Sequence, residues 1–191
     1  MNVRTIGVIG AGALGRGIAC AVAASGYRVV LEDISSQALA EGLGAIKQML
    51  MEYAASGDIR AQQSDSALAN VATAHSVQDA CRMADLLIEA VAEEMEMKLE
   101  LFTIFDKFAK PGAIFASSTG SLSIAEIAAM TFCAENCVGM RFVDPVQKMK
   151  RLEIVRAPET SDATVNTCVE VGRRMGKDVI VVREARQPGR M

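Results

Sequence analysis

The chain has 191 residues, of which 51% are hydrophobic, so it is long enough to bury the core of one domain. A net charge of −3 without basic runs argues against nucleic acid as a partner. No apolar stretch reaches the roughly 18 residues that a membrane span needs. Five cysteines without a C-x-x-C pair, and a single histidine, predict no metal site and free thiols in a reducing cytoplasm.

The N-terminal residues predict a strand, a turn and a helix. Thr5–Ile9 is a short apolar run typical of a buried strand, and residues 10–15 are rich in glycine. Small apolar residues over 18–24 predict that a helix follows this turn. Residues 28–31, rich in valine and followed by two acids, predict a second strand.

A helical hairpin is expected directly after this second strand. Ser35 and Ser36 can cap a long helix that runs to Met51 or beyond, and residues 56–58 break it. A shorter, more polar helix is expected over residues 63–69. An insert of this length exceeds a plain connection, so we interpret it as a functional arm.

The rest of the chain alternates between strand and helix patterns. Strands are expected at residues 70–74, 85–90, 113–116, 137–142, 152–155 and 179–182, and helices at 93–110, 123–130 and 161–175. This alternation predicts an α/β Rossmann fold, a doubly wound and mostly parallel sheet. We expect one domain over residues 1–183 and a short polar tail over 184–191.

The first turn carries the pattern Gly10-x-Gly12-x-x-Gly15 between a predicted strand and a predicted helix. Gly10 allows the tight turn, Gly12 lets the backbone approach a pyrophosphate, and Gly15 lets helix and strand pack closely. The N-terminus of the helix attracts phosphate. Asp33 ends the second strand, where a carboxylate binds the adenosine ribose and repels a 2′-phosphate, so NAD is expected rather than NADP.

Further motifs follow in a fixed order along the chain. They are residues 10–19, Glu89-Ala90-Val91 with Glu93 and Lys98, Leu101-Phe102, residues 115–119 and 121–124, Asp144-Pro145-Val146 with Met149, and residues 153–155. From about Thr5 to Val182 this order resembles the NAD-binding domain of the 3-hydroxyacyl-CoA dehydrogenase family, which includes bacterial 3-hydroxybutyryl-CoA dehydrogenases. The resemblance implies hydride transfer between NAD and a 3-hydroxyacyl-CoA or 3-oxoacyl-CoA in fatty-acid metabolism.

The resemblance also assigns a set of residues to NAD binding. They are Gly10, Ala11, Gly12, Ala13, Leu14, Gly15, Asp33, Ala90, Val91, Glu93, Lys98 and Ser118. For Glu93 and Lys98 the alternative is a surface ion pair without a cofactor role. Lys47 and Arg60, on the hairpin where the family contacts CoA, are candidates for its phosphates, and their alternative is a solvated helix face.

The candidate catalytic residues depart from the family pattern. Glu153 falls on the glutamate that orients the family's base histidine, but Arg141 stands in the place of that histidine. Ser118 and Asp144 replace two asparagines, and Gly120 replaces a serine. A guanidinium stays protonated and cannot act as the base, so Arg141 is expected to stabilise an oxyanion or to pair with Glu153. His75, the only histidine, is expected at a surface turn.

Four interpretations of function remain open. The chain is an impaired oxidoreductase, or a non-catalytic module that binds NAD and acyl-CoA. In a third, Arg141 grips a substrate carboxylate and Lys98 donates a proton. In a fourth, the family's C-terminal helical domain, absent from this sequence, is supplied by a separate chain or replaced by a second copy. The fourth interpretation predicts an exposed apolar patch where that domain would dock, and Leu122, Ile124 and the final segment are the places to look for it.

Overall fold

The computed structural model, which describes residues 2–57 and 60–184, has one eight-stranded sheet in the order β3-β2-β1-β4-β5-β6-β7-β8. The strands are β1 (Thr5–Ile9), β2 (Arg28–Glu32), β3 (Val71–Thr73), β4 (Leu86–Glu89), β5 (Ile114–Ser117), β6 (Cys137–Phe142), β7 (Arg151–Arg156) and β8 (Asp178–Arg183). Neighbouring strands are parallel except for β6 and β7. The Rossmann fold is therefore confirmed, with β7 and β8 reversed at one edge.

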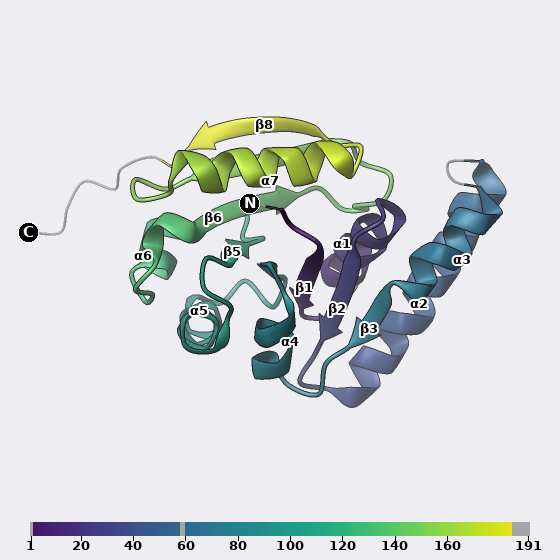
Figure 1. The fold of residues 1–191 in the computed structure, drawn as a ribbon, viewed down its shortest axis with the longest axis horizontal. Coiled ribbons are helices and arrows are strands. Elements are labelled where there is room, and N and C mark those ends of the chain that lie inside the picture. The colour runs from purple at the N-terminus through teal and green to yellow at the C-terminus, as the bar shows by residue number, and fades with distance from the viewer. Residues whose placement is uncertain (1, 58–59, 185–191) are drawn as a thin grey trace, which may run out of the picture.

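Helices cover both faces of the sheet (Figure 1). They are α1 (Ala13–Ala24), α2 (Ser36–Ser56), α3 (Ala61–Ala69), α4 (Val77–Met83), α5 (Met95–Phe108), α6 (Ile124–Ala128) and α7 (Asp162–Arg174), with a 3₁₀ turn at Ala134–Asn136. One core packs α1, α2, α3 and α7 on the sheet, and the other packs α4, α5 and α6. The second core holds a cluster of aromatic rings from Phe102, Phe105 and Phe115.

Serine side chains begin several of these helices. Ser35 and Ser161 accept hydrogen bonds from the amides of Ala38 and Thr164, as their positions predict for N-caps. Ser76 caps α4 in the same way. Helix α4 has only seven residues and was not expected, because two apolar turns are too short to show helical periodicity.

The helical hairpin after β2 is confirmed. Helix α2 spans 21 residues and buries only Gly42, Ile46 and Leu50, and it ends at Gly57, which has a φ of +82°. Helix α3 packs along it, and the two project beside β3 at the side of the molecule away from β8 (Figure 1).

The end of the domain is tied back to α6. Both carboxylate oxygens of Glu184 accept hydrogen bonds from the α6 amides of Ile124 and Ala125. Glu184, the first residue of the expected tail, is thus tied to the domain, and residues 185–191 lie outside the described residues. Ile124 is fully buried, so the expected apolar docking patch there is wrong, and Leu122 packs partly buried against the second core.

Two expectations from composition can be compared with the fold. All five cysteines are free thiols, as expected. Over residues 2–57 and 60–184, no cluster of His, Cys, Asp and Glu could hold a metal ion. Within the same ranges, no helix combines the length and hydropathy needed to cross a bilayer.

Candidate functional site

The glycine turn between β1 and α1 is built as its pattern predicts. Gly10 has a φ of +105°, and a side chain there would meet the carbonyl oxygen of Ala90 at 2.7 Å. A Cβ on Gly15 would lie 1.9 Å from the carbonyl oxygen of Gly10, so only glycine allows α1 to start this close. A Cβ on Gly12 would meet nothing within 4 Å, because this residue faces open space.

The N-terminus of α1 presents backbone amides to that open space. Its first helical hydrogen bond runs from the amide of Arg16 to the carbonyl of Gly12, at 3.0 Å. The amides of Ala13, Leu14 and Gly15 precede it and have no partner within the helix. Together with the positive end of the helix dipole, they form a binding site for phosphate.

Asp33 braces this turn from the end of β2. One carboxylate oxygen accepts a hydrogen bond from the amide of Ala11 at 2.8 Å, and the other accepts one from Ser35 at 2.8 Å. The amide of Ala11 therefore donates to Asp33 and is not available to a phosphate. The carboxylate is only partly buried and keeps lone pairs for a ligand hydroxyl.

A cleft of about 650 Å³ opens beside the turn. The turn, the end of β2, the segment before α4, the segment after β4 and one face of α5 line it. Three acids, Glu32, Asp33 and Glu100, lie on its walls, and of the described lining residues none is lysine or arginine. His75 lines the cleft from its turn, and Ala90 and Val91 line it opposite.

Glu32 is the lining residue that sequence reasoning missed. It was interpreted only as the end of a strand, yet its side chain is 95% buried, with a relative exposure of 5%. Burial, and then the neighbouring charge of Asp33, raise the pKa of Glu32 to about 7. The available signal was an acid at a position where a parallel strand is normally apolar on both faces.

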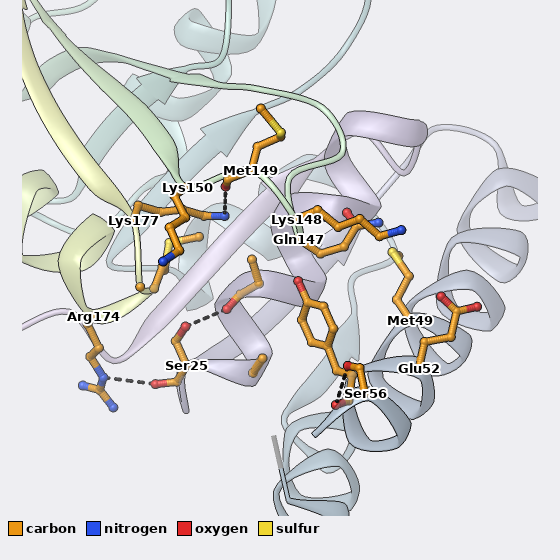
Figure 2. Close-up of a pocket in the computed structure, with 15 residues that line it drawn as sticks. Ser25, Met49, Glu52, Ser56, Gln147, Lys148, Met149, Lys150, Arg174 and Lys177 are labelled. Atoms are coloured by element: carbon orange, nitrogen blue, oxygen red, sulfur yellow. Dashed lines mark hydrogen bonds between the residues drawn. The ribbon is translucent and has the colours of Figure 1, made fainter. Parts of the chain in front are cut away.

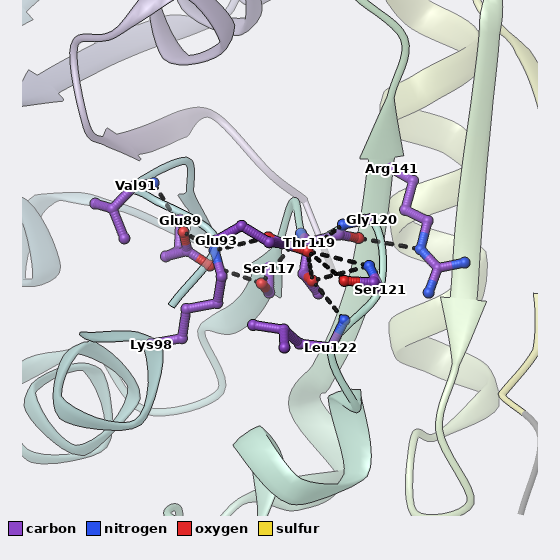
Figure 3. Close-up of polar contacts among 10 residues, drawn as sticks. All are labelled: Glu89, Val91, Glu93, Lys98, Ser117, Thr119, Gly120, Ser121, Leu122 and Arg141. Atoms are coloured by element: carbon purple, nitrogen blue, oxygen red, sulfur yellow. Dashed lines mark hydrogen bonds and ion pairs between the residues drawn. The ribbon is translucent and has the colours of Figure 1, made fainter. Parts of the chain in front are cut away.

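A buried ion pair lies at the ends of β4 and β5 (Figure 3). The ammonium of Lys98 is 2.6 Å from Glu89, and both side chains are fully buried. The hydroxyl of Ser117 and the amide of Val91 donate to the same carboxylate, at 2.6 and 2.8 Å. Lys98 is therefore not part of a surface ion pair. Its expected contact with NAD and its role as a proton donor to substrate stay predictions.

Glu93 joins this pair to the loop after β5. One of its oxygens lies 3.6 Å from Lys98, and the other accepts hydrogen bonds from Thr119, Gly120 and Ser121. Burial alone would raise the pKa of Glu93, but these hydrogen bonds and the charge of Lys98 outweigh it and lower that pKa. Glu93 therefore stays a carboxylate that fixes the loop.

Arg141 lies on the other side of the same loop. Its Nε donates to the carbonyl of Thr119 at 3.0 Å (Figure 3). Its guanidinium is 3.9 Å from Glu153, its direct neighbour across β6 and β7. Glu153 also pairs with Arg151. Ser118 is nearly buried and its amide donates to the carbonyl of Glu89. The expected Arg141–Glu153 pair is present.

A second hollow, of about 760 Å³, lies between the hairpin and the segment after β6 (Figure 2). Lys148, Lys150, Arg174 and Lys177 line it, with Glu52 of α2 as its acid. Lys177 is held by the carbonyl of Met149 at 2.7 Å and by that of Val146, and burial lowers its pKa. Lys47 and Arg60, the residues expected to bind phosphate, do not line this hollow.

Comparison with known proteins identifies the family to which this chain belongs. Residues 5–185 match the NAD-binding domain of 3-hydroxyacyl-CoA dehydrogenase. The chain belongs to the 3-hydroxyacyl-CoA dehydrogenase family. It is 35% identical to a probable 3-hydroxybutyryl-CoA dehydrogenase of Bacillus subtilis, over 96% of this chain and 64% of that protein. It is 34% identical to the mitochondrial hydroxyacyl-coenzyme A dehydrogenase of Homo sapiens, over 95% of this chain and 60% of that protein.

Solved structures of the family agree with this assignment. The 3-hydroxybutyryl-CoA dehydrogenase of Escherichia coli superposes with a TM-score of 0.91 at 32% identity, over 96% of this chain and 39% of that one. The enzyme of Ralstonia eutropha gives a TM-score of 0.91 at 33% identity, over 96% of this chain and 65% of that one. The chain thus spans less than two thirds of these relatives and corresponds to their NAD-binding domain.

NAD is the cofactor of this dehydrogenase domain, and the residues present fit it. The amides at the start of α1 would hold the pyrophosphate, and Asp33 would hold the adenosine ribose. The nicotinamide half would then extend toward Glu93 and Ser118, past the point where the strand order reverses between β1 and β4.

Proposed function

We propose that this chain binds NAD and an acyl-CoA as its family does but transfers hydride slowly, because Arg141 occupies the position of the catalytic base. Reduction of a 3-oxoacyl-CoA moves a hydride from NADH to C3 and a proton to the C3 oxygen. A fast reaction needs a neighbouring acid to supply this proton. The observation that carries the proposal is the anchored guanidinium of Arg141, held by Thr119 and Glu153 at the end of β6.

Arg141 can still act on a developing charge. A guanidinium donates hydrogen bonds to an oxyanion but does not release its proton at neutral pH. Its Nε is already committed to Thr119, which leaves the terminal nitrogens for Glu153 or a ligand. The proton must therefore come from solvent, and we expect a slow reaction without the histidine.

The basic hollow supports acyl-CoA as the second ligand. CoA carries phosphate groups, which lysine and arginine bind through charge-assisted hydrogen bonds. The hollow combines Lys148 and Lys150, which follow Arg141 by less than ten residues, with Arg174 of α7 and the inner side of α2. This gives the hairpin the role in CoA binding that its length suggested, through different residues from Lys47 and Arg60.

Preference for NAD over NADP follows from the walls of the cleft. A 2′-phosphate on the adenosine ribose would face Glu32, Asp33 and Glu100 without a lysine or arginine from the described lining. Repulsion between these carboxylates and the 2′-phosphate raises the free energy of the NADP complex. We expect NADH to bind at least tenfold more tightly than NADPH in a fluorescence titration, and tighter NADPH binding would contradict the role of Asp33.

Restoring the family's side chains tests the proposal. The variant R141H/G120S restores the histidine and the serine of the family. A Cβ at Gly120 has room, because the nearest atom to it is a carboxylate oxygen of Glu93 at 3.9 Å. We expect about a 100-fold rise in acetoacetyl-CoA reduction over the wild type, the usual size of a general acid–base contribution. R141Q/G120S is the control, because it removes the cation without adding a base.

The assay also separates the alternative function, a module that binds NAD and acyl-CoA without turnover. The hydrogen bond of Arg141 to Thr119 and its ion pair with Glu153 favour that function, because they give the guanidinium a structural role. If NADH binds and R141H/G120S stays inactive, the binding module is supported. If the wild type turns over as fast as R141H/G120S, the impairment is disproved.

A partner for the substrate side is part of the proposal. Strand β8 forms the edge of the sheet and exposes Ile180 and Val181, each nearly half accessible. A helical chain or a second copy would cover this edge and close the cleft to water. Sedimentation at several concentrations tests the second copy, and a constant monomer mass would exclude it.

A further inference from the structure

Glu32 has a position that the binding of phosphate and ribose does not explain. Side chains along β2 alternate between faces, and Val30 belongs to the core under α4 and α5. Glu32, two residues on, points to that same face, toward Cys81 of α4, whose pKa is raised by burial and then by the charge of Glu32. Asp33 points the other way, to the glycine turn.

The carboxyl of Glu32 lines the cleft and lacks a protein partner. Among the hydrogen bonds and ion pairs of residues 2–57 and 60–184, none involves its side-chain oxygens, although the side chain is 95% buried at an exposure of 5%. Among the described residues no enclosed side-chain oxygen lacks a hydrogen-bond partner, so the carboxyl oxygens of Glu32 are open to the cleft. A ligand in the cleft can therefore form hydrogen bonds with them.

The base of a bound dinucleotide is the group that reaches this part of the cleft. With the pyrophosphate at α1 and the ribose at Asp33, the adenine extends away from the nicotinamide, toward the segment before α4. Ile34, Val77 and Ile104 line the cleft with apolar side chains, which suit the faces of a purine ring. Glu32 is a polar group among them.

We propose that Glu32 recognises the adenine base of NAD as a neutral carboxyl group. A protonated carboxyl has an O–H donor beside a carbonyl acceptor. The edge of adenine offers the complement, a ring nitrogen that accepts beside an amino group that donates. This inference rests on NAD binding in this cleft, and it adds a specific contact to the base.

The surroundings of Glu32 favour the neutral form. The titratable groups that face it are Asp33 beside it, Cys81 of α4, His75 from the turn before α4, and Glu100 across the cleft. Two of these are acids, and the pyrophosphate of NAD adds negative charge. In the free protein the pKa of Glu32 is already about 7, and binding that requires the neutral form raises it further.

Proton uptake on binding is therefore the expected signature. Below pH 7 the carboxyl is already protonated and the affinity for NADH is constant. Above pH 7 each binding event must first take up a proton, so the affinity falls by up to tenfold per pH unit. Over pH 6.5 to 8.5 we expect a loss of about 10- to 30-fold.

Calorimetric titration with NADH and with ADP-ribose tests this contact. The wild type should lose affinity for both between pH 6.5 and 8.5 and take up a proton, seen as a dependence of the binding enthalpy on the buffer. E32Q, whose amide keeps a donor beside an acceptor, should bind tightly at both pH values without proton uptake. E32L should bind about tenfold more weakly than E32Q at both pH values.

Two controls separate the possible outcomes. H75Q removes the only histidine, the residue type that usually changes charge near neutral pH. This variant should keep the pH dependence of NADH binding. If E32L binds as tightly as E32Q, or if H75Q alone abolishes the pH dependence, the role of Glu32 is disproved while the NAD site stands. If the wild type binds NADH at no pH, the cofactor site itself fails.

Discussion

Two parts of the candidate site, the glycine turn at the NAD end and the loop after β5 with the end of β6 at the proposed substrate end, use their residues in different ways. At the NAD end, the glycine turn acts through backbone amides and through the space that missing side chains leave. At the substrate end, the loop after β5 and the end of β6 act through the side chains of Glu93, Arg141 and Glu153. A backbone site changes only if the fold changes, whereas a side-chain site can change chemistry within an intact fold.

That difference explains why one end keeps the family pattern and the other does not. Arg141 fits at the end of β6 because the carbonyl of Thr119 and the carboxylate of Glu153 receive its guanidinium. Any residue larger than glycine at position 15 would displace α1 itself. The backbone end is therefore expected to be sensitive to small changes, and the side-chain end tolerant of large ones.

The largest effect is expected for G15A. A Cβ at Gly15 would lie 1.9 Å from the carbonyl of Gly10, so α1 must shift from the turn. We expect the free energy of unfolding to fall by roughly 3 kcal/mol or more, measured by urea denaturation. G12A is the matched control, because its Cβ meets open space, and it should leave stability unchanged while weakening NADH. Equal stability of G15A and G12A would remove the distinction between the two ends.

Next in size is the loss of the Lys98 ammonium. In K98M the fully buried carboxylate of Glu89 is left without its cation, which costs about 3–5 kcal/mol when one partner of a buried pair is removed. The double variant K98M/E89Q should recover most of this loss, because the buried charge is gone. Thermal unfolding measures both. A double variant less stable than K98M would show that the pair is not the source of the effect.

A smaller, pH-dependent effect is expected at Glu32. Its pKa is about 7 in the folded chain and close to 4.5 when unfolded. Because the folded state holds the proton more tightly, Glu32 lowers the stability as pH rises from about 4.5 to 7, and the deficit is constant above 7. E32Q should therefore have a free energy of unfolding higher than that of the wild type by up to about 3 kcal/mol at pH 8, and one equal to it at pH 4. A difference that is independent of pH would exclude ionisation as its cause.

The smallest effect is expected for R141A. The guanidinium is 3.9 Å from Glu153 and partly exposed, and such ion pairs contribute less than about 1 kcal/mol. Chemical denaturation should show a loss below that value, in contrast to K98M. A loss of 3 kcal/mol would mean that the substrate end is also a structural element, and the comparison between the two ends would fail.

Sequence reasoning predicted the fold and the NAD turn well, because both depend on patterns that repeat locally. Alternating apolar runs predicted the strands, and Gly10 and Gly15 have a steric reason that any Rossmann turn shares. The burial of Lys98 and Glu32 could not be predicted in this way. It depends on how α5 and α4 pack on strands far away in the sequence. The place of Glu32 at the end of a parallel strand was a weak signal, whereas Lys98 on a helix had none.

The free cysteines lie in both packed layers, so their reactivity can report how fast each layer opens. Cys20, Cys81, Cys137 and Cys168 are buried, and burial raises their pKa values to about 12. Cys133, at the edge of the second core, is half-buried and has a pKa of about 11. A thiol reagent can reach the four buried thiols only when the surrounding structure opens, whereas half-buried Cys133 should react first. The order of labelling at the other four positions would rank the opening rates of the two layers, and mass spectrometry reads it from one sample.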